Sequence, residues 1–349
     1  RRHTRYISVT GVQTCALPIF IVPTTSLVSQ LASDFADYGF ASDKLIHRVF
    51  AGQDKQSNKP ITITTWQSVY KLPKEYFSNF EVVIGDEAHL FKAKSLTSIL
   101  DKLTDCRYRF GFTGTLDGSN THKLVLEGLF GPVRKVITTS ELIDKKHLAD
   151  FQIKAIVLTY PDEVRKMIAR SNDYQSEIDY LVRLPERNKF IKNLSLSLEG
   201  NTLLLFQFVE KHGKVLYDMV SKEAGDRKVF FVSGEVDGEA REDIRRIVEN
   251  ESNAIIVASY GTFSTGVNIK NLHNVIFSSP SKSRVRNLQS IGRGLRKSAT
   301  KTSSVLYDIV DEMSWKSKKN YTLLHFMERV KIYNEEKFNY KIYKVELKV

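Results

Sequence analysis

Short apolar runs rich in β-branched residues alternate along this chain with segments of helical periodicity. The run Phe20–Val22 is followed by apolar residues at helical spacing through Thr24–Tyr38. Further strand-like runs follow at Ile61–Thr65, Glu81–Gly85 and Phe110–Thr113. This alternation predicts a parallel sheet with crossover helices, and the nearly continuous apolar strands predict a sheet that is covered on both faces.

The same alternation returns in the second half of the chain. Its strand-like and helical segments are Thr202–Phe208, His212–Val220, Val229–Val232, Arg241–Asn250, Ala254–Ala258, Asn274–Ser278, Val285–Arg296 and Val305–Val310. The stretch between the halves is polar, and the tail combines an amphipathic helix with an alternating, strand-like end. We therefore predict an α/β protein with domains at 20–140 and 198–312, a connector at 141–197 and a C-terminal extension at 313–349.

The composition limits the class of protein. A length of 349 residues suggests two domains, and 42% hydrophobic with 26% charged residues excludes wholesale disorder. Cys15 and Cys106 are too few for a disulfide framework or a four-ligand zinc site. No apolar run approaches the roughly 18 residues of a transmembrane helix, so we expect a soluble, cytoplasmic protein. The formal charge of +12 favours a polyanionic partner, of which nucleic acid is the commonest.

Residues 1–19 do not fit the pattern of the rest. The string VTGVQTCALPI resembles translated sequencing-adapter sequence, and no initiator Met is present. Polar residues interrupt the apolar ones too often for a signal peptide. We expect residues 1 to about 19 to be a non-native artefact, joined to a gene that is cut at its 5′ end. A real, poorly ordered terminus is the alternative.

Two adjacent carboxylates follow one of the predicted strands. Asp86-Glu87-Ala88-His89 comes directly after Val82–Gly85, and open α/β sheets build their sites at such carboxyl ends. Phosphoryl transfer from a nucleotide uses such a pair, one carboxylate to hold Mg²⁺ and one to position the attacking water. A solvated strand end is the alternative. A zinc motif is excluded because no second His lies four residues from His89.

Small hydroxyl residues follow three other predicted strands. These segments are Thr24-Thr25, Thr64-Thr65-Trp66-Gln67-Ser68 and Thr113-Gly114-Thr115. Taken singly, each is more typical of a helix cap than of a ligand site. Together with the paired carboxylates, they predict one working edge of the sheet that contacts phosphates through side chains and backbone N–H groups.

Two segments of the second half carry related chemistry. Gln289–Arg296 lies in a predicted helix, in which Arg293 and Arg296 are three residues apart and share a face. Guanidinium groups are natural partners for the charge that develops on a γ-phosphate during transfer, and a solvated basic helix is the alternative. Ser259–Asn268 follows a predicted strand and is rich in hydroxyl residues and glycine, which suits close backbone approach to a ligand.

The ordered set PTTSLVSQ, TTWQS, DEAH, TGT, SYGTFSTGVNIKN and QSIGRGLR resembles motifs Ia, Ib, II, III, V and VI of the superfamily 2 helicases. The match runs from about Phe20 to Asp308. IVPTTSLVSQLASDFADYGF, YFSNF…DEAHL, VSGEVD and EEKFNY are most similar to the UvsW-type helicases of tailed phages, which remodel branched DNA in recombination and the restart of stalled forks. The resemblance implies two RecA-like domains with ATP in the cleft between them.

The resemblance also implies roles for residues of the first domain. Asp86 would coordinate Mg²⁺ through water, and Glu87 would be the catalytic base. His89 would link the ATP site to the DNA site, and coupling of the domains would fall to Thr113 and Thr115. The residues that would line the nucleic-acid track are Thr24, Thr25, Thr65 and Gln67.

In the second domain, the implied roles concern the nucleotide. Arg293 and Arg296 would reach the γ-phosphate, with Arg296 as the arginine finger. Gln289 would link the ATP and DNA sites, and Gly266 would lie near the nucleotide. The family often has an acid where Asn268 stands, so a ribose contact is not carried over to that position.

One departure from the family is an absence. Superfamily 2 enzymes have a P-loop, G-x-x-x-x-G-K-[ST], ahead of motif Ia, and its N–H groups and Lys cradle the β- and γ-phosphates. The sequence contains no such motif, and the adapter-like segment stands in its place. We therefore expect the first RecA-like domain to lack its N-terminal strand and P-loop, and this chain to be inactive as an ATPase.

The resemblance predicts an ATP-dependent DNA helicase or translocase, with ATP and Mg²⁺ as cofactors. Its expected partner is duplex or branched DNA of any sequence, in recombination, repair and replication restart, and no membrane. A phage-encoded protein would act in the host cytoplasm. The rivals are another superfamily 2 motor, such as a restriction-subunit translocase or RNA helicase, and a non-catalytic nucleic-acid-binding protein. The oligomeric state stays open.

Overall fold

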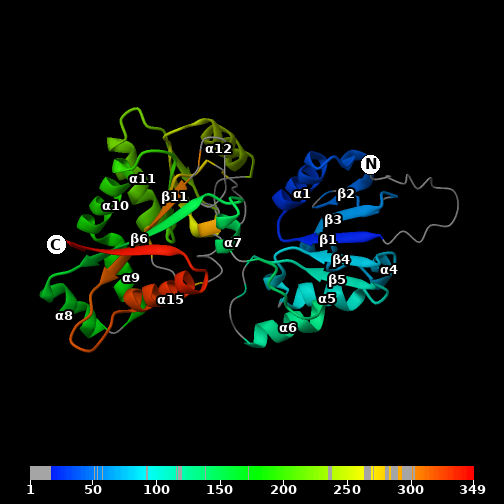
Figure 1. Ribbon diagram of the computed structural model, residues 1–349, viewed down its shortest axis with the longest axis horizontal. Helices are drawn as coiled ribbons and strands as arrows, with labels where there is room; N and C mark the ends of the chain where they lie inside the picture. The colour runs from blue at the N-terminus through cyan, green and yellow to red at the C-terminus, as the bar shows by residue number, and fades with distance from the viewer. Residues whose placement is uncertain are drawn as a thin grey trace. The chain divides into compact units, whose positions relative to one another are not determined.

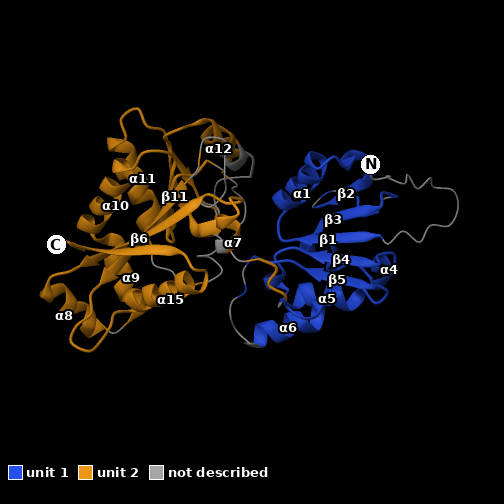
Figure 2. Ribbon diagram, in the orientation of Figure 1, with its two compact units in different colours: residues 1–133 blue, residues 134–349 orange. Residues whose placement is uncertain are grey.

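The computed structural model describes residues 17–349 except 51, 53, 57, 92, 115, 117–119, 138, 172, 235–237, 263–268, 270, 280–282, 284–289, 293–300 and 302. The chain divides into two compact units, unit 1 within residues 1–133 and unit 2 within residues 134–349 (Figure 2). Among the described residues, no helix is long and apolar enough to cross a membrane.

Unit 1 contains a five-stranded sheet in which all neighbouring strands are parallel. The strands are β1 (Pro18–Val22), β2 (Ile46–Val49), β3 (Ile61–Thr65), β4 (Val82–Gly85) and β5 (Tyr108–Gly111), in the spatial order β2-β3-β1-β4-β5 (Figure 1). β3 has its predicted limits, and β1, β4 and β5 lie within two residues of theirs. β2 was not predicted.

Helices cover both faces of this sheet, as its apolar strands predicted. α1 (Thr25–Asp37) packs Val28 and Ala32 against Val22 and Ile63 on one face. The opposite face, which carries Ile19, packs against the other helices. These are α3 (Trp66–Val69), α4 (Lys74–Phe77), α5 (Lys94–Lys102) and α6 (Asn120–Phe130), and a short α2 (Ser42–Leu45) precedes β2.

β5 lies at one edge of the sheet. Tyr108 pairs in register with Val82, and Phe110 pairs with Ile84. Tyr108, Phe110 and Phe112 are 48%, 48% and 58% exposed. In the part of unit 1 that the structure describes, β5 has a neighbouring strand on one side and a row of uncovered aromatic rings.

Unit 2 contains a seven-stranded sheet, again with only parallel pairs. Its strands are β6 (Asp150–Thr159), β7 (Thr202–Phe206), β8 (Val229–Val232), β9 (Ile255–Ser259), β10 (Asn274–Phe277), β11 (Ser303–Glu312) and β12 (Asn339–Glu346). The spatial order is β12-β6-β11-β10-β7-β9-β8. The α/β class with two parallel sheets is therefore as predicted.

Two hydrophobic clusters lie on the two faces of this second sheet. One contains Ile168, Leu181, Ile191 and Leu216 from helices α8 to α11, and the other contains Phe326 from α15. The helices of unit 2 are α7 (Thr139–Asp144), α8 (Asp162–Ser171), α9 (Tyr174–Arg183), α10 (Pro185–Ser197), α11 (Lys214–Glu223), α12 (Gly238–Asn250) and α15 (Tyr321–Glu335), with a π-helical turn η2 (Val209–Gly213) before α11.

Residues 141–197, expected to form a connector, contribute a strand and helices to unit 2. β6 pairs with β11 over its whole length, from Asp150↔Ser303 to Thr159↔Glu312. Gln152 and Lys154 made this strand look too polar, but both are partly exposed, and the Lys154 amine lies over the Tyr307 ring. The expected C-terminal extension also joins unit 2, because β12 pairs with β6.

Candidate functional site

The segments that carry the predicted site residues of unit 1 meet at one edge of its sheet. Val22 pairs in register with Thr65, and Gly85 pairs with both Ile21 and Gly111. The chain therefore leaves β1, β3, β4 and β5 at the same carboxyl edge. Thr65 ends β3 at this edge, and the loops or helix starts that follow the strands carry Thr24, Thr25, Gln67, Asp86, Glu87 and Thr113.

Backbone hydrogen bonds hold the acidic turn after β4. The N–H of Asp86 donates to the carbonyl of Ile21 at 3.0 Å, and the N–H of Ala88 donates to the carbonyl of Phe112 at 2.8 Å. Between them Glu87 has φ 50° and ψ 50°, a left-handed conformation that is uncommon for a residue with a side chain. The N–H of Glu87 also donates to Asp86 Oδ1 at 2.8 Å, so the two acids are fixed relative to each other.

Glycine at two strand ends allows the close packing behind this turn. A Cβ added at Gly85 would lie 2.8 Å from the ring of Phe91, and one added at Gly111 would lie 2.9 Å from the ring of Phe130. The two rings pack edge to face, 5.1 Å apart. Sequence reasoning did not single out these glycines, although a glycine directly before an acidic strand end is a signal for close approach.

The electrostatics of the turn favour a cation at Asp86. Burial raises the pKa of Asp86, and the neighbouring charge of Glu87 raises it further, whereas the Glu87 N–H and His89 lower it. A nearby cation compensates for the desolvation of a carboxylate. The described residues contain no group of three or more His, Cys, Asp and Glu side chains that could cage a metal. Mg²⁺ is commonly held by one or two carboxylates together with substrate phosphates, and the paired acids fit that arrangement.

His89 connects the acidic turn to the segment after β5. The ring lies within the short helix η1 (Ala88–Leu90) and is 6% exposed. Its Nδ1 is 2.9 Å from Thr113 Oγ1 and 3.2 Å from Glu87 Oε2. The structure therefore brings Glu87, His89 and Thr113 together in one chain of contacts.

The four residues expected on the nucleic-acid track differ in accessibility. Thr24 caps α1, because its hydroxyl accepts the N–H of Leu27 at 3.4 Å. Thr25 and Gln67 are exposed, and Gln67 Nε2 donates to the carbonyl of Pro23 at 3.3 Å. Thr65 is only 3% exposed, and its hydroxyl contacts that of Ser68 at 2.8 Å. Its side chain is thus occupied inside unit 1.

Several predicted site residues lie outside the described residues. They are Thr115, Gly266, Gln289, Arg293 and Arg296. Within the same motifs the structure describes Ser290 and Ile291, each 1% exposed. It also describes Ser259, whose hydroxyl donates to Thr262 Oγ1 at 2.8 Å.

Two family patterns match the chain. "Type III restriction enzyme, res subunit" matches residues 13–118, and "Helicase conserved C-terminal domain" matches residues 186–298. Two parallel sheets with an acidic turn after one strand, together with these matches, define a helicase of superfamily 2.

The relatives narrow this class. The ATP-dependent DNA helicase uvsW of Enterobacteria phage T4 is 38% identical, over 94% of this chain and 68% of that protein. The crystal structure of T4 UvsW superposes with a TM-score of 0.50, over 95% of this chain and 68% of that one. The chain belongs to the UvsW family of superfamily 2 helicases.

More distant relatives have lower sequence identity to this chain. The DNA 3′-5′ translocase XPB2 of Sulfurisphaera tokodaii is 24% identical over 80% of this chain and 69% of that protein. The ATP-dependent Type ISP restriction-modification enzyme LlaBIII bound to DNA has a TM-score of 0.65 at 14% identity, over 95% of this chain and 28% of that one. The second likeness concerns the fold alone, and it agrees with the predicted pair of RecA-like sheets.

Proposed function

We propose that this protein acts as an ATP-driven motor that moves along or remodels duplex or branched DNA without regard to base sequence. The family membership supports helicase activity, and T4 UvsW is named a DNA helicase. Such an activity would serve recombination, repair and replication restart. If a phage encodes the protein, it would act in the cytoplasm of the host cell.

The observation that carries this proposal is the chain of contacts Glu87–His89–Thr113 beside Asp86. Asp86 would hold Mg²⁺ through water, and Glu87 would accept the proton of the attacking water. His89 Nδ1 is 2.9 Å from Thr113 Oγ1, so His89 would link the ATP site to the DNA site, and Thr113 with Thr115 would couple the domains. Mg²⁺–ATP supplies the phosphoryl group and the charge that polarises it.

The residues of the second half complete the proposal by resemblance. Arg293 and Arg296 would neutralise charge on the γ-phosphate, with Gln289 and Gly266 near the nucleotide. Their positions lie outside the described residues.

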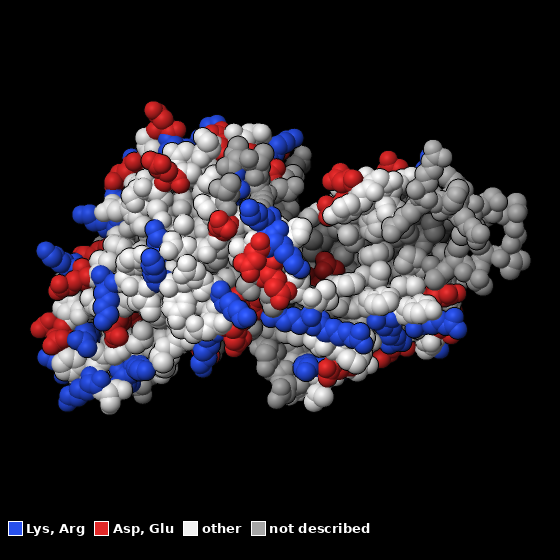
Figure 3. All heavy atoms as spheres, viewed as in Figure 1, with Lys and Arg blue, Asp and Glu red and all other residues white. Residues whose placement is uncertain are grey.

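The charge of the chain supports contacts with phosphates. Lys and Arg outnumber Asp and Glu by 52 to 40, and blue cationic side chains spread over both units in Figure 3. We propose that Thr24, Thr25 and Gln67 face the nucleic acid. Thr65 would act there by shaping the turn, because its own hydroxyl is engaged with Ser68.

Binding across a salt series tests the nucleic-acid part of the proposal. Affinities for duplex, forked and four-way DNA of unrelated sequences should be similar within each type and should fall steeply with salt, because neutralised phosphates release counterions. A strong preference for one base sequence, or affinity independent of salt, contradicts the proposal. Tighter binding to RNA of matched shape favours the rival RNA-directed motor.

Glu87→Gln tests the chemistry in any form of the protein that hydrolyses ATP. Turnover should fall by roughly 10²-fold or more, as on loss of a general base, while DNA binding persists. Glu75→Gln, on the exposed side of α4, is the matched control and should leave turnover unchanged. Equal turnover in the two variants removes Glu87 from the mechanism. The 349 residues hold no P-loop motif, so we expect no appreciable hydrolysis from this chain alone, and robust DNA-stimulated phosphate release contradicts that expectation.

A further inference from the structure

The two residues that follow β10 are tied to their surroundings by nearly every polar group they have. Ser278 donates its N–H and its hydroxyl to the carbonyl of Leu205, at 3.1 and 2.6 Å. Its own carbonyl accepts Nη2 of Arg187 at 2.9 Å. Ser278 and Ser279 are 0% and 1% exposed, so these bonds form where water cannot replace them.

Ser279 joins three elements. Its hydroxyl accepts the N–H of Gln207 at 3.3 Å and lies 3.1 Å from Nδ1 of His212, while its carbonyl accepts the hydroxyl of Tyr260 at 3.0 Å. Tyr260 is the first residue after β9, and β9 and β10 are separated in the sheet by β7. The Tyr260 hydroxyl therefore reaches across the end of β7 and connects the first residue after β9 to the second residue after β10.

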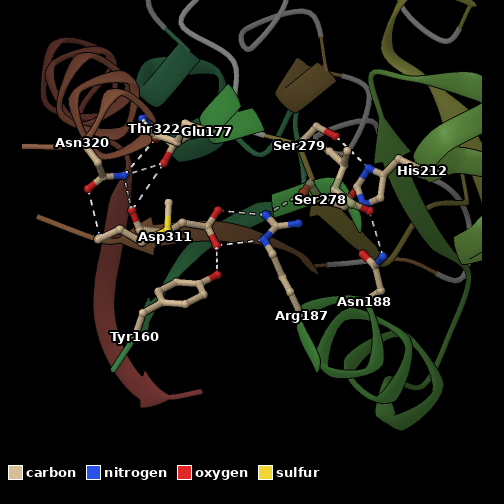
Figure 4. A network of polar contacts seen from close by, with 12 residues as sticks. Tyr160, Glu177, Arg187, Asn188, His212, Ser278, Ser279, Asp311, Asn320 and Thr322 are labelled. Atoms are coloured by element: carbon tan, nitrogen blue, oxygen red, sulfur yellow. Dashed lines mark hydrogen bonds and ion pairs between the residues drawn. The ribbon is translucent and has the colours of Figure 1, made fainter. Parts of the chain in front are cut away.

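Packing of the π-helical turn on β7 holds His212 in place. It lies in the π-helical turn η2, where a Cβ added at Gly213 would come within 2.5 Å of the Phe206 ring, so the turn packs directly onto the end of β7. Burial and the nearby Arg187 charge lower the pKa of His212 to about 3. The ring is accordingly neutral at ordinary pH, and its contact with Ser279 is a bond between uncharged groups (Figure 4).

Arg187 anchors Ser278 to β11. Its Nε and Nη2 donate to the two carboxylate oxygens of Asp311 at 2.8 and 2.9 Å, and Asp311 also accepts the hydroxyl of Tyr160 at 2.6 Å. The guanidinium lies between Asp311 and Ser278 in Figure 4, and both charged side chains are 0% exposed. A buried ion pair contributes little net stability, so its placement is better explained by the geometry that it fixes.

We propose that Ser279, with Tyr260 and His212, is a buried positioning hub that sets Tyr260, the first residue after β9, relative to the first residues after β10. Tyr260 belongs to Ser259–Asn268, and Gln289–Arg296 follows Ser279 along the chain, so one hub would set where both stretches that the sequence assigns to the nucleotide begin. This inference rests on the proposed function for its consequence, but not for its geometry. All three residues are buried, so they would act on the nucleotide only through the segments that follow them along the chain.

Hydrogen–deuterium exchange of the 349-residue chain tests the hub. Tyr260→Phe removes the hydrogen bond to the Ser279 carbonyl, and Ser279→Ala removes the hydroxyl that contacts Gln207 and His212. Each variant should speed exchange about fivefold or more in both segments, 259–268 and 280–300, as expected when at least one net hydrogen bond is lost. Ser195→Ala removes an equally buried hydroxyl, bonded at 2.8 Å to the carbonyl of Lys192 in α10, and should leave both segments unchanged. A rise in only one segment, no rise, or the same rise in Ser195→Ala overturns the proposal.

A second pair of variants separates positioning from packing. His212→Asn retains a polar atom near the place of Nδ1 and should keep the exchange of both segments within about twofold of the unmodified chain, whereas His212→Leu should speed it about fivefold. Equal behaviour of the two variants overturns the hub, as does complete exchange of both segments in the unmodified chain at the earliest time. DNA binding, measured separately, tests the proposed function. If the chain does not bind DNA but the variants change exchange as expected, the proposed function is refuted and the positioning hub is supported.

Discussion

Replacing Asp311 alone by alanine should destabilise unit 2 far more than replacing Asp311 together with its partners Arg187 and Tyr160 by apolar residues. The carboxylate accepts two bonds from Arg187 and one from Tyr160, all at 2.6–2.9 Å and out of contact with water. Asp311→Ala leaves the guanidinium buried without its counter-charge, which costs about 3–5 kcal/mol. The orphaned Tyr160 hydroxyl adds on the order of 1 kcal/mol. The sum is a large part of the roughly 5–15 kcal/mol that holds a domain folded.

The comparison that isolates the cause is a triple replacement. Arg187→Met, Asp311→Leu and Tyr160→Phe together leave no buried charge and keep most of the volume, so the triple variant should lie within about 2 kcal/mol of the unmodified chain. Asp308→Ala provides an independent repeat, because Asp308 accepts Arg329 at 2.8 and 2.9 Å and Tyr333 at 2.8 Å in the same buried manner.

Urea unfolding followed by tryptophan fluorescence measures these differences. The chain has two tryptophans, Trp66 in unit 1 and Trp315 in unit 2, so a Trp66→Phe background makes the signal report unit 2 alone. If Asp311→Ala lowers the free energy of unfolding by less than about 1 kcal/mol, the reasoning about the unpaired buried charge is refuted. A triple variant as unstable as the single one shows that the ion pair itself, rather than its disruption, supplies the stability.

Three further predictions concern stability. Burial raises the pKa of Asp86, so its contribution to the free energy of unfolding is favourable below the ordinary pKa of an aspartate and is lost as pH rises through the raised pKa. Asp86→Asn should therefore stabilise unit 1 at neutral pH but not in acid. Trp66 fluorescence in a Trp315→Phe background measures this difference. The pKa of His212 is lowered to about 3, so unit 2 should lose about 1.4 kcal/mol per pH unit below 6.5 from this group; His212→Asn should remove that component, and an unchanged slope contradicts the assignment. Gly85→Ala should cost about 1–3 kcal/mol through its clash with Phe91, and Phe91→Leu should recover part of that cost; additive losses in the double variant argue against the clash.

Local sequence patterns were sufficient where a strand is uniformly apolar or β-branched. Ile61–Thr65 and Val229–Val232 have their predicted limits for that reason. β2 was missed because His47 and Arg48 interrupt its apolar residues, and β6 was missed because polar residues alternate along its partly exposed half. Which residues of these strands are exposed is decided by neighbours that are distant in the sequence.

The site was predictable to the extent that strand ends share an edge. Parallel topology alone predicted that the acidic turn and Thr113 share an edge, and the structure shows that His89 contacts both Glu87 and Thr113 there. The left-handed Glu87 and the buried Thr65 were beyond a local reading, because both depend on tertiary contacts. Arg187 and Asp311 are 124 residues apart and carry no spacing signal that would have paired them.

The open side of β5 has a practical consequence for handling a chain of these residues. Within the described residues, β5 has no strand partner along one edge, and the rings of Tyr108, Phe110 and the following Phe112 are exposed, so this edge offers a second molecule both hydrogen bonds and apolar surface. Intermolecular strand addition then competes with solubility, and the competition shifts toward association as concentration rises. A lysine in place of Phe112, the residue after β5, would place a charge in this row of rings and should reduce such association.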